Sequence, residues 1–130
     1  MSIELLLQAD LTKLKRPEKE VKIKRLSELF GGAMIFKLRA VSTDEVSGLQ
    51  NMTFNVQEQS VDISELQIQV VLAGIIEPEL KNAELLAHFG VPTPKELLMK
   101  LLSPGEIKGL YDKISDLSGY GKDSVEDVKN

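Results

Sequence analysis

The order of apolar and polar residues near the start of the chain predicts two strands. In Glu18–Leu26, apolar Val21 and Ile23 alternate with charged residues, which is the period of a strand with one buried face. Ala33–Val41 shows the same alternation, and Gly31-Gly32 between the two segments indicates a turn. The sequence therefore predicts an antiparallel β-hairpin, whose apolar face must pack on the rest of the chain because an isolated hairpin is marginally stable.

After this hairpin the apolar positions recur with the period of an α-helix, and five helices are predicted. Four of their starts carry a hydroxyl or carboxylate N-cap, with glutamate at the third helical position and, in two of them, proline at the first. The predicted starts or spans are Ser42-Thr43-Asp44-Glu45, Asp62-Ile63-Ser64-Glu65, Glu79–Phe89 with Gly90 as C-terminal cap, Thr93-Pro94-Lys95-Glu96 and Ser103-Pro104-Gly105-Glu106.

The second of these helices is apolar nearly all round beyond Gln69 and is predicted to be the central, buried helix. Its β-branched residues leave a strand as the alternative, although its length favours a helix, and Pro78 bounds it. The expected fold class is α+β and mostly helical, with an N-terminal antiparallel β-hairpin followed by about five α-helices and a disordered C-terminal tail.

The length of 130 residues fits one domain. We expect an N-terminal arm at residues 1–17, a single helical domain with the hairpin at 18–120 and a flexible tail at 121–130. The apolar residues near the start could dock on the core or on a partner. The longest apolar run, Val70–Ile76, is far shorter than the ~20 residues of a membrane helix, and no signal-peptide pattern precedes it, so a cytosolic chain is expected.

Composition argues against most enzyme classes. The chain has no cysteine and one histidine, so disulfides, cysteine-ligated zinc, iron–sulfur clusters and thiol nucleophiles are excluded. His88 has no nucleophile motif beside it and is interpreted as a residue near a helix C-terminus. Gly119-Tyr120-Gly121 lacks the strand and helix that flank a phosphate-binding loop. The acidic residues lack the spacing of a calcium loop. We expect no catalytic residue, no metal and no cofactor.

Charge is unevenly distributed along the chain, whose formal net charge is −4. Lys13–Arg25 holds seven basic and two acidic residues, a local net charge of +5, whereas Ala40–Leu80 holds seven acidic residues and no basic one. The basic segment is interpreted either as a patch for nucleic acid or an acidic partner, or as a solvated surface. The opposite charges could also guide self-association.

Three segments of the C-terminal half resemble a family of phage tail assembly chaperones, found in tailed phages and prophages of Gram-positive bacteria. Lys19–Ser27 is also similar to the N-terminal strand region of that family, and Leu117-Ser118-Gly119-Tyr120 fits as well, so the resemblance spans roughly residues 15 to 120. The three segments are EPELKN at 77–82, FGVPTPKELL at 89–98 and KLLSPGEI at 100–107.

This resemblance implies a non-enzymatic protein of the host bacterial cytoplasm. Such chaperones are thought to bind the phage tape measure protein transiently, keep it soluble and help recruit tail tube subunits. Apolar ridges of the C-terminal helices could cover the apolar stripes of such a long helical client. The candidate contact residues are Leu98, Leu101, Leu102, Leu110 and Tyr111.

Two alternatives stay open at this stage. The chain could be a structural tail or baseplate component that is retained in the particle. It could also be a nucleic-acid-associated protein that uses Lys13–Arg25, although the net negative charge and the low aromatic content of 5% argue against this.

Overall fold

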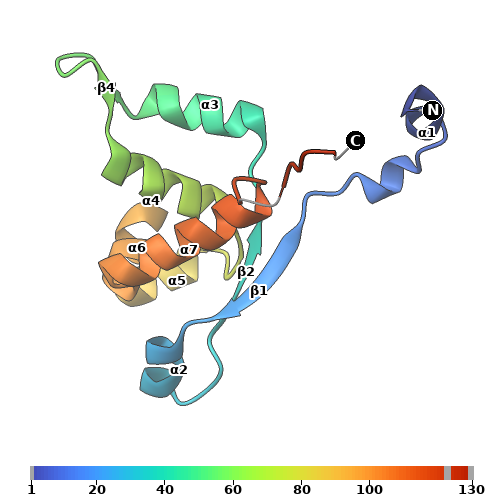
Figure 1. The fold of residues 1–130 in the computed structure, drawn as a ribbon. Helices are drawn as coiled ribbons and strands as arrows, with labels where there is room; N and C mark the ends of the chain where they lie inside the picture. The colour runs from blue at the N-terminus through green and yellow to red at the C-terminus, as the bar shows by residue number, and fades with distance from the viewer. Residues whose placement is uncertain (1, 122–123, 129–130) are drawn as a thin grey trace.

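The computed structural model describes residues 2–121 and 124–128. In this part of the chain it has seven α-helices, one short 3₁₀ helix and five short strands (Figure 1). Their bounds are α1 Ser2–Leu7, η1 Leu11–Lys13, β1 Glu18–Lys22, α2 Lys24–Phe30, β2 Ile35–Arg39, α3 Thr43–Met52, β3 Phe54–Asn55, β4 Ser60–Val61, α4 Ile63–Gly74, β5 Ile75–Glu77, α5 Ala83–Phe89, α6 Pro94–Leu101 and α7 Pro104–Leu117. No helix in the described ranges is long and apolar enough to cross a membrane.

The predicted antiparallel pairing of two N-terminal strands is confirmed, with β1 and β2 in a register that places Val21 opposite Phe36. The predicted strand over Glu18–Leu26 is wrong in its second half, because the chain turns into helix α2 directly after Ile23. Helix α2 replaces the expected tight turn. It ends at Gly31, whose φ of 72° is the left-handed conformation that glycine adopts without strain.

A third strand, β5, was not predicted. It pairs antiparallel with β2 on the side opposite β1, so the sheet order is β1-β2-β5. The segment from Ile75 to Glu77 was interpreted as the end of the central helix, but the strand alternative holds for these three residues. Pairing with β2 supplies backbone hydrogen-bond partners there, and β-branched isoleucines favour this geometry.

Four of the five predicted helix starts are confirmed by side-chain caps. Ser42, Asp62, Thr93 and Ser103 each accept a hydrogen bond from the backbone N–H three residues later. The third prediction is wrong at its start, because α5 begins at Ala83 and is capped by the Asn82 side chain. Its predicted cap at the other end, Gly90, is confirmed, with a left-handed φ of 67°.

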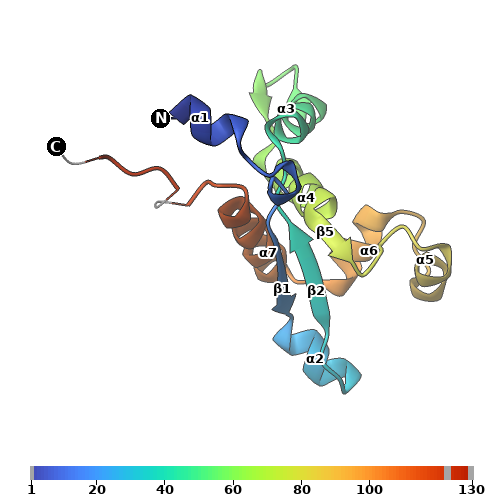
Figure 2. The ribbon, with the colours of Figure 1, turned by 90° about the vertical axis from the view of Figure 1, so that its right-hand side faces the viewer.

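The core lies where α4, α6 and α7 pack on one another and on the sheet (Figures 1 and 2). Alternate residues of β2 point into it, so the sheet has one buried face and one polar face. Helix α4 is central, as predicted, because it contacts α3, α6, α7 and β5. The fully buried side chains are Phe36, Leu26, Leu38, Leu97, Leu98, Ile114 and Val71.

Two segments extend from this body. The N-terminal arm, residues 2–17, contains α1 and η1 and runs away from the helices (Figures 1 and 2). The small hairpin β3–β4 projects beyond α3 and α4. The predicted flexible tail at 121–130 falls partly on residues 122, 123, 129 and 130, which lie outside the described residues. Residues 121 and 124–128 belong to no helix or strand.

Candidate interaction surfaces

The five predicted contact residues do not form one exposed surface. Leu98, Leu102 and Leu110 are 1%, 4% and 3% exposed and belong to the core. Leu101 and Tyr111 are half-buried and pack against the core with part of each side chain exposed. In this conformation the three buried leucines present little surface to a partner, whereas Leu101 and Tyr111 keep part of their side chains exposed.

The physical reason is the size of the sheet. Three short strands cannot enclose a core by themselves, so the helices must cover the buried face of β2 with their apolar side chains. Leu97 and Leu98 of α6 and Leu110 of α7 supply this cover. An apolar stripe at helical spacing looks the same in a sequence whether it meets the core or a partner.

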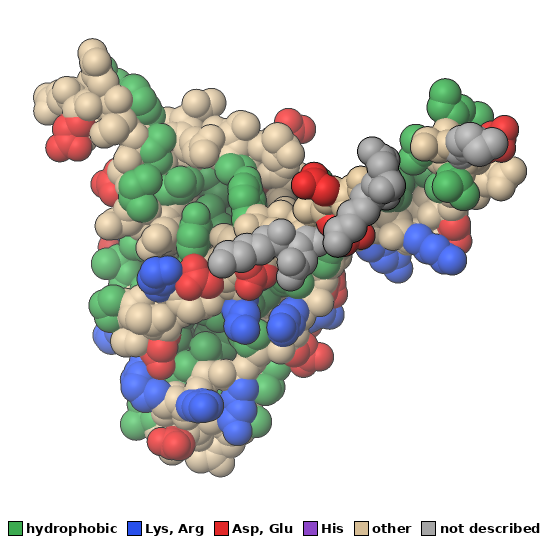
Figure 3. Space-filling view, viewed as in Figure 1, with side chains coloured by type: hydrophobic (Ala, Val, Ile, Leu, Met, Phe, Trp, Pro, Cys, Tyr) green, Lys and Arg blue, Asp and Glu red, His purple; other side chains and the backbone are tan. Residues whose placement is uncertain are grey.

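One groove on the surface, called the α7 groove here, lies between α3, α4 and α7. Its volume is about 430 Å³. Figure 3 shows hydrophobic side chains on this face of the body, between the helices. Two aspartates of α7, Asp112 and Asp116, are the charged residues among those that line it. The lining residues are Val41, Val46, Gln50, Leu66, Val70, Tyr111, Asp112, Ser115, Asp116 and Tyr120.

A second groove, the β5 groove, has a volume of about 840 Å³ and runs along β5 toward the start of α6. Its apolar walls come from α3, α4 and β5, and its charged residues include three cations. Arg39 and Lys95 are held by Glu45 and Glu65, at 2.7 and 2.8 Å. The lining residues are Arg39, Leu49, Gln69, Leu72, Ala73, Ile75, Ile76, Glu79, Leu80, Lys81, Thr93, Pro94 and Lys95.

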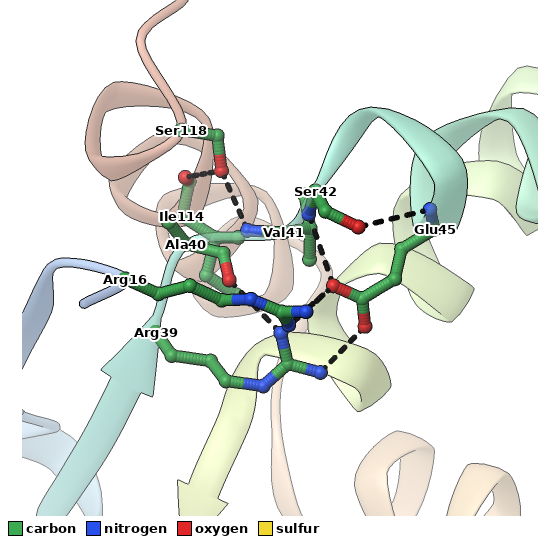
Figure 4. A network of polar contacts seen from close by, with 8 residues as sticks. All are labelled: Arg16, Arg39, Ala40, Val41, Ser42, Glu45, Ile114 and Ser118. Atoms are coloured by element: carbon green, nitrogen blue, oxygen red, sulfur yellow. Dashed lines mark hydrogen bonds and ion pairs between the residues drawn. The ribbon is translucent and has the colours of Figure 1, made fainter. Parts of the chain in front are cut away.

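The start of α3 is tied to the N-terminal segments through Glu45 (Figure 4). Its carboxylate accepts the backbone N–H of Ser42, which completes the predicted capping box, and it also binds two arginines. Arg39 of β2 binds it through two nitrogens, at 3.0 and 2.7 Å, and Arg16 of the arm binds it at 2.6 Å. The hydrogen bonds from Arg39 above all lower the pKa of Glu45 to about 2.

The start of α7 repeats this arrangement. Glu106 completes the capping box of Ser103 and binds Arg25 of α2, whose nearest nitrogen lies 2.9 Å away. The same guanidinium donates to the Leu101 carbonyl at 2.6 Å, so α2 is linked to the ends of two helices. The Arg25 hydrogen bonds lower the pKa of Glu106 to about 2. The sequence predicted both capping boxes but none of the three arginine partners, Arg16, Arg39 and Arg25.

Much of the exposed apolar surface lies outside the predicted contact residues. Six large apolar side chains of the arm are between 72% and 81% exposed. Around β3 and the start of α4, Met52, Phe54, Val56 and Ile63 are also exposed. One signal in the sequence points to this, because no predicted element covers the apolar residues near the start. The arm residues are Ile3, Leu5, Leu6, Leu7, Leu11 and Leu14.

His88, Gly119 and the acidic side chains, the remaining candidates, do not form a catalytic or metal-binding cluster within the described residues. His88 is exposed, and its ring meets that of Phe89 edge to face at 5.2 Å. Gly119 follows the end of α7 with φ of 90°, as a helix stop does. Across residues 2–121 and 124–128, no three His, Asp or Glu side chains come together as a metal site would need.

Comparison with known proteins places this architecture in a family. The crystal structure of the protein yqbn matches 93% of this chain and 97% of its own, with a TM-score of 0.68 and 21% sequence identity, which shows a shared fold. No curated protein sequence matches the chain. The model of the phage XkdN-like tail assembly chaperone family matches residues 3–129. The chain therefore belongs to the phage XkdN-like tail assembly chaperone family.

Proposed function

We propose that this protein binds the phage tape measure protein transiently during tail assembly, keeps it soluble and helps to recruit tail tube subunits. Family membership supports a tail assembly chaperone, which indicates a non-catalytic role and binding to tail proteins. The identification of the tape measure protein as the tail protein that is bound is our proposal. The setting of this activity would be the cytoplasm of the host bacterium.

The observation that carries the proposal is the β5 groove. Its lining combines apolar side chains with charged ones, a composition that suits the apolar stripe of an amphipathic helix. A long helical client would expose such stripes before it is packed in a tail. Covering them with a small, net negative domain would reduce aggregation of the complex.

Ile76 offers a way to test this groove without disturbing the core. Its side chain lines the groove, is half-buried and is not among the residues that pack against the core cluster. Ile76→Glu places a charge in the lining of the groove, where an apolar client side chain would have to desolvate it. Met99→Glu is the matched control, because Met99 is 53% exposed on α6 and lines neither groove.

The experiment is co-expression with a phage tape measure protein, followed by pull-down and by measurement of the soluble tape measure fraction. We expect wild type and Met99→Glu to retain the client, and Ile76→Glu to lose most of the complex while its circular dichroism spectrum stays unchanged. A tape measure protein that is equally soluble without this chain, with no complex recovered, would contradict the proposal.

Mass spectrometry of purified particles separates a chaperone from a structural component. We expect this protein to be absent from complete tails, whereas a retained tail or baseplate protein would be present in stoichiometric amount. The nucleic-acid alternative has less support, because Arg16 and Arg25 of the basic segment are held in ion pairs within the domain.

A further inference from the structure

The N-terminal arm carries apolar surface that its own domain leaves uncovered. Helix α1 has no buried residue, although four of its six residues carry large apolar side chains. The next two apolar side chains, Leu11 and Leu14, are 76% and 77% exposed. Figure 3 shows these hydrophobic side chains as a separate group, away from the body of the molecule. A contiguous apolar segment of this kind marks a surface that binds another molecule.

The α7 groove complements this arm in polarity and in charge. Its walls are valine, leucine and tyrosine side chains, and Asp112 and Asp116 stand among them. Asp112 meets Lys108 at 3.2 Å, but both side chains are more than half exposed, so this pair is weak. In the arm, Lys13 and Lys15 stand on either side of its last apolar residue, Leu14, and form no ion pair within the described residues. Leucines can therefore enter the groove while lysines meet its aspartates.

The arm leaves the domain directly beside this groove. Its last residues are fixed there, because the Ala40 N–H donates to the Pro17 carbonyl at 2.9 Å and Arg16 binds Glu45. Val41 and Val46, the neighbours of these two anchors, line the groove. The end of the arm and the groove therefore lie next to each other, which is compatible with a reciprocal, two-fold exchange of arms between identical chains.

We propose that the arm of one copy binds in the α7 groove of a second copy, and that two copies exchange arms in this way. The size is sufficient, because in an exchange each copy contributes its arm, residues 2 to 14, and its ten groove residues, which together fall within the roughly 20–30 residues per side of a stable interface. This proposal concerns the chain alone and is independent of whether the client is a tape measure protein.

A second copy is favoured over the arm's own groove by the direction of the arm. The two anchors at Arg16 and Pro17 fix the end of the arm, and Figure 1 shows the arm running away from α3 and α7. Reaching its own groove would require the chain to reverse immediately before these anchors. Binding to a facing copy keeps the direction that the anchors set.

The first test measures molar mass by light scattering over a range of concentrations. We expect the wild-type protein to have twice the chain mass of 14.4 kDa. The double variant Leu5→Glu/Leu6→Glu should raise the dimer dissociation constant by about a hundredfold or more. Leu29→Glu is the matched control and should stay dimeric, because Leu29 is 65% exposed on α2, far from the groove in sequence and absent from its lining. A wild-type monomer at every concentration would overturn the proposal.

Charge reversal tests the pairing of the two surfaces. Lys13→Glu/Lys15→Glu in the arm and Asp112→Lys/Asp116→Lys in the groove should each weaken the dimer by about tenfold at low salt, and the two sets combined should restore it. Lys22→Glu/Lys24→Glu makes the same charge change beside α2 and should leave the dimer unchanged. Equal weakening by all variants without restoration would contradict the assigned pairing.

Because the chain lacks cysteine, introduced thiols can tell exchange from folding back. Leu7→Cys in one chain is mixed with Ser115→Cys in another, since Leu7 is 81% exposed on α1 and Ser115 lines the groove. We expect a mixed disulfide dimer, and little of it when Leu29→Cys replaces Leu7→Cys. A chain with both thiols that closes on itself as a monomer would overturn the proposal in favour of its own groove.

Discussion

Gly74, the last residue of α4, lies against the fully buried Ile114 of α7. A Cβ atom at this position would come within 2.5 Å of Ile114 Cδ1, 2.9 Å of its Cγ1 and 3.0 Å of its Cγ2. Three atoms of one β-branched side chain cannot all move away inside a close-packed core. The absence of a side chain at Gly74 therefore allows the approach of α4 to α7.

We expect Gly74→Ala to lower the free energy of unfolding by about 1–3 kcal/mol, because overpacking forces α4 and α7 apart. Gly109→Ala in the middle of α7 is the control, since nothing lies within 4 Å of the added Cβ. It should raise the free energy of unfolding by roughly 0.4–1 kcal/mol, because alanine restricts the unfolded chain. Urea denaturation followed by circular dichroism measures both, and equal effects from both variants would contradict this account.

At the residue scale, the sequence predicted which positions are apolar but not which of them are covered. Leu98 and Leu101 stand three residues apart on the same helix, yet one is 1% exposed and the other half-buried. The exposure of each leucine depends on which other elements pack against it, and the spacing of apolar residues in one helix carries no information about those elements. The arginine partners of Glu45 and Glu106 were missed for the same reason, because Arg25 is 81 residues away from Glu106.

Among the elements, those with local start signals were predictable and those made by long-range pairing were not. Capping residues fix the beginnings of α3, α4, α6 and α7, and the structure has all four. Strand β5 has three residues and depends on β2, which lies more than 30 residues earlier. Helix α2 begins without a side-chain cap, so the strand alternation before it concealed its start.

The starts of α6 and α7 provide a matched pair for testing a capping glutamate. Both helices begin with a proline after a hydroxyl N-cap and have a glutamate at the third position. Only the glutamate of α7, Glu106, accepts a hydrogen bond from the backbone N–H of its N-cap residue and binds an arginine. We expect Glu106→Ala to lower the free energy of unfolding by about 1 kcal/mol. Glu96→Ala should lower the free energy of unfolding by only a few tenths of a kcal/mol, because Glu96 acts through the helix dipole alone. Thermal and urea unfolding measure both, and equal losses would show that the return bond contributes nothing.

Across the whole molecule, the two capping glutamates connect the basic N-terminal third to the helical body. Arg16 and Arg39 meet Glu45, and Arg25 meets Glu106, so the opposite charges that the sequence separates are partly paired within the domain. This explains why the basic segment is not a simple cationic patch. It also makes the attachment of the arm and of α2 depend on the ionisation of two carboxylates.

Acid is therefore expected to weaken the fold in a defined range. Glu45 and Glu106 have pKa values lowered from 4.5 to about 2, chiefly by hydrogen bonds from Arg39 and Arg25. A group whose pKa is lower in the folded than in the unfolded chain adds stability that is complete above the unfolded pKa. That stability is lost as the pH falls through the folded pKa, so the range runs from about 4.5 down to about 2.

We expect Glu45→Gln/Glu106→Gln to be less stable than wild type at neutral pH and to show a shallower loss of stability between pH 4.5 and 2, the limits set by the two pKa values. Glu84→Gln, at an exposed carboxylate of α5, should follow the wild-type curve. The free energy of urea unfolding at each pH measures the slope. If the stability of the double variant falls with pH in parallel with that of wild type, acid acts through other carboxylates. Glu65, whose pKa is lowered by a hydrogen bond from Lys95, is then the next residue to replace.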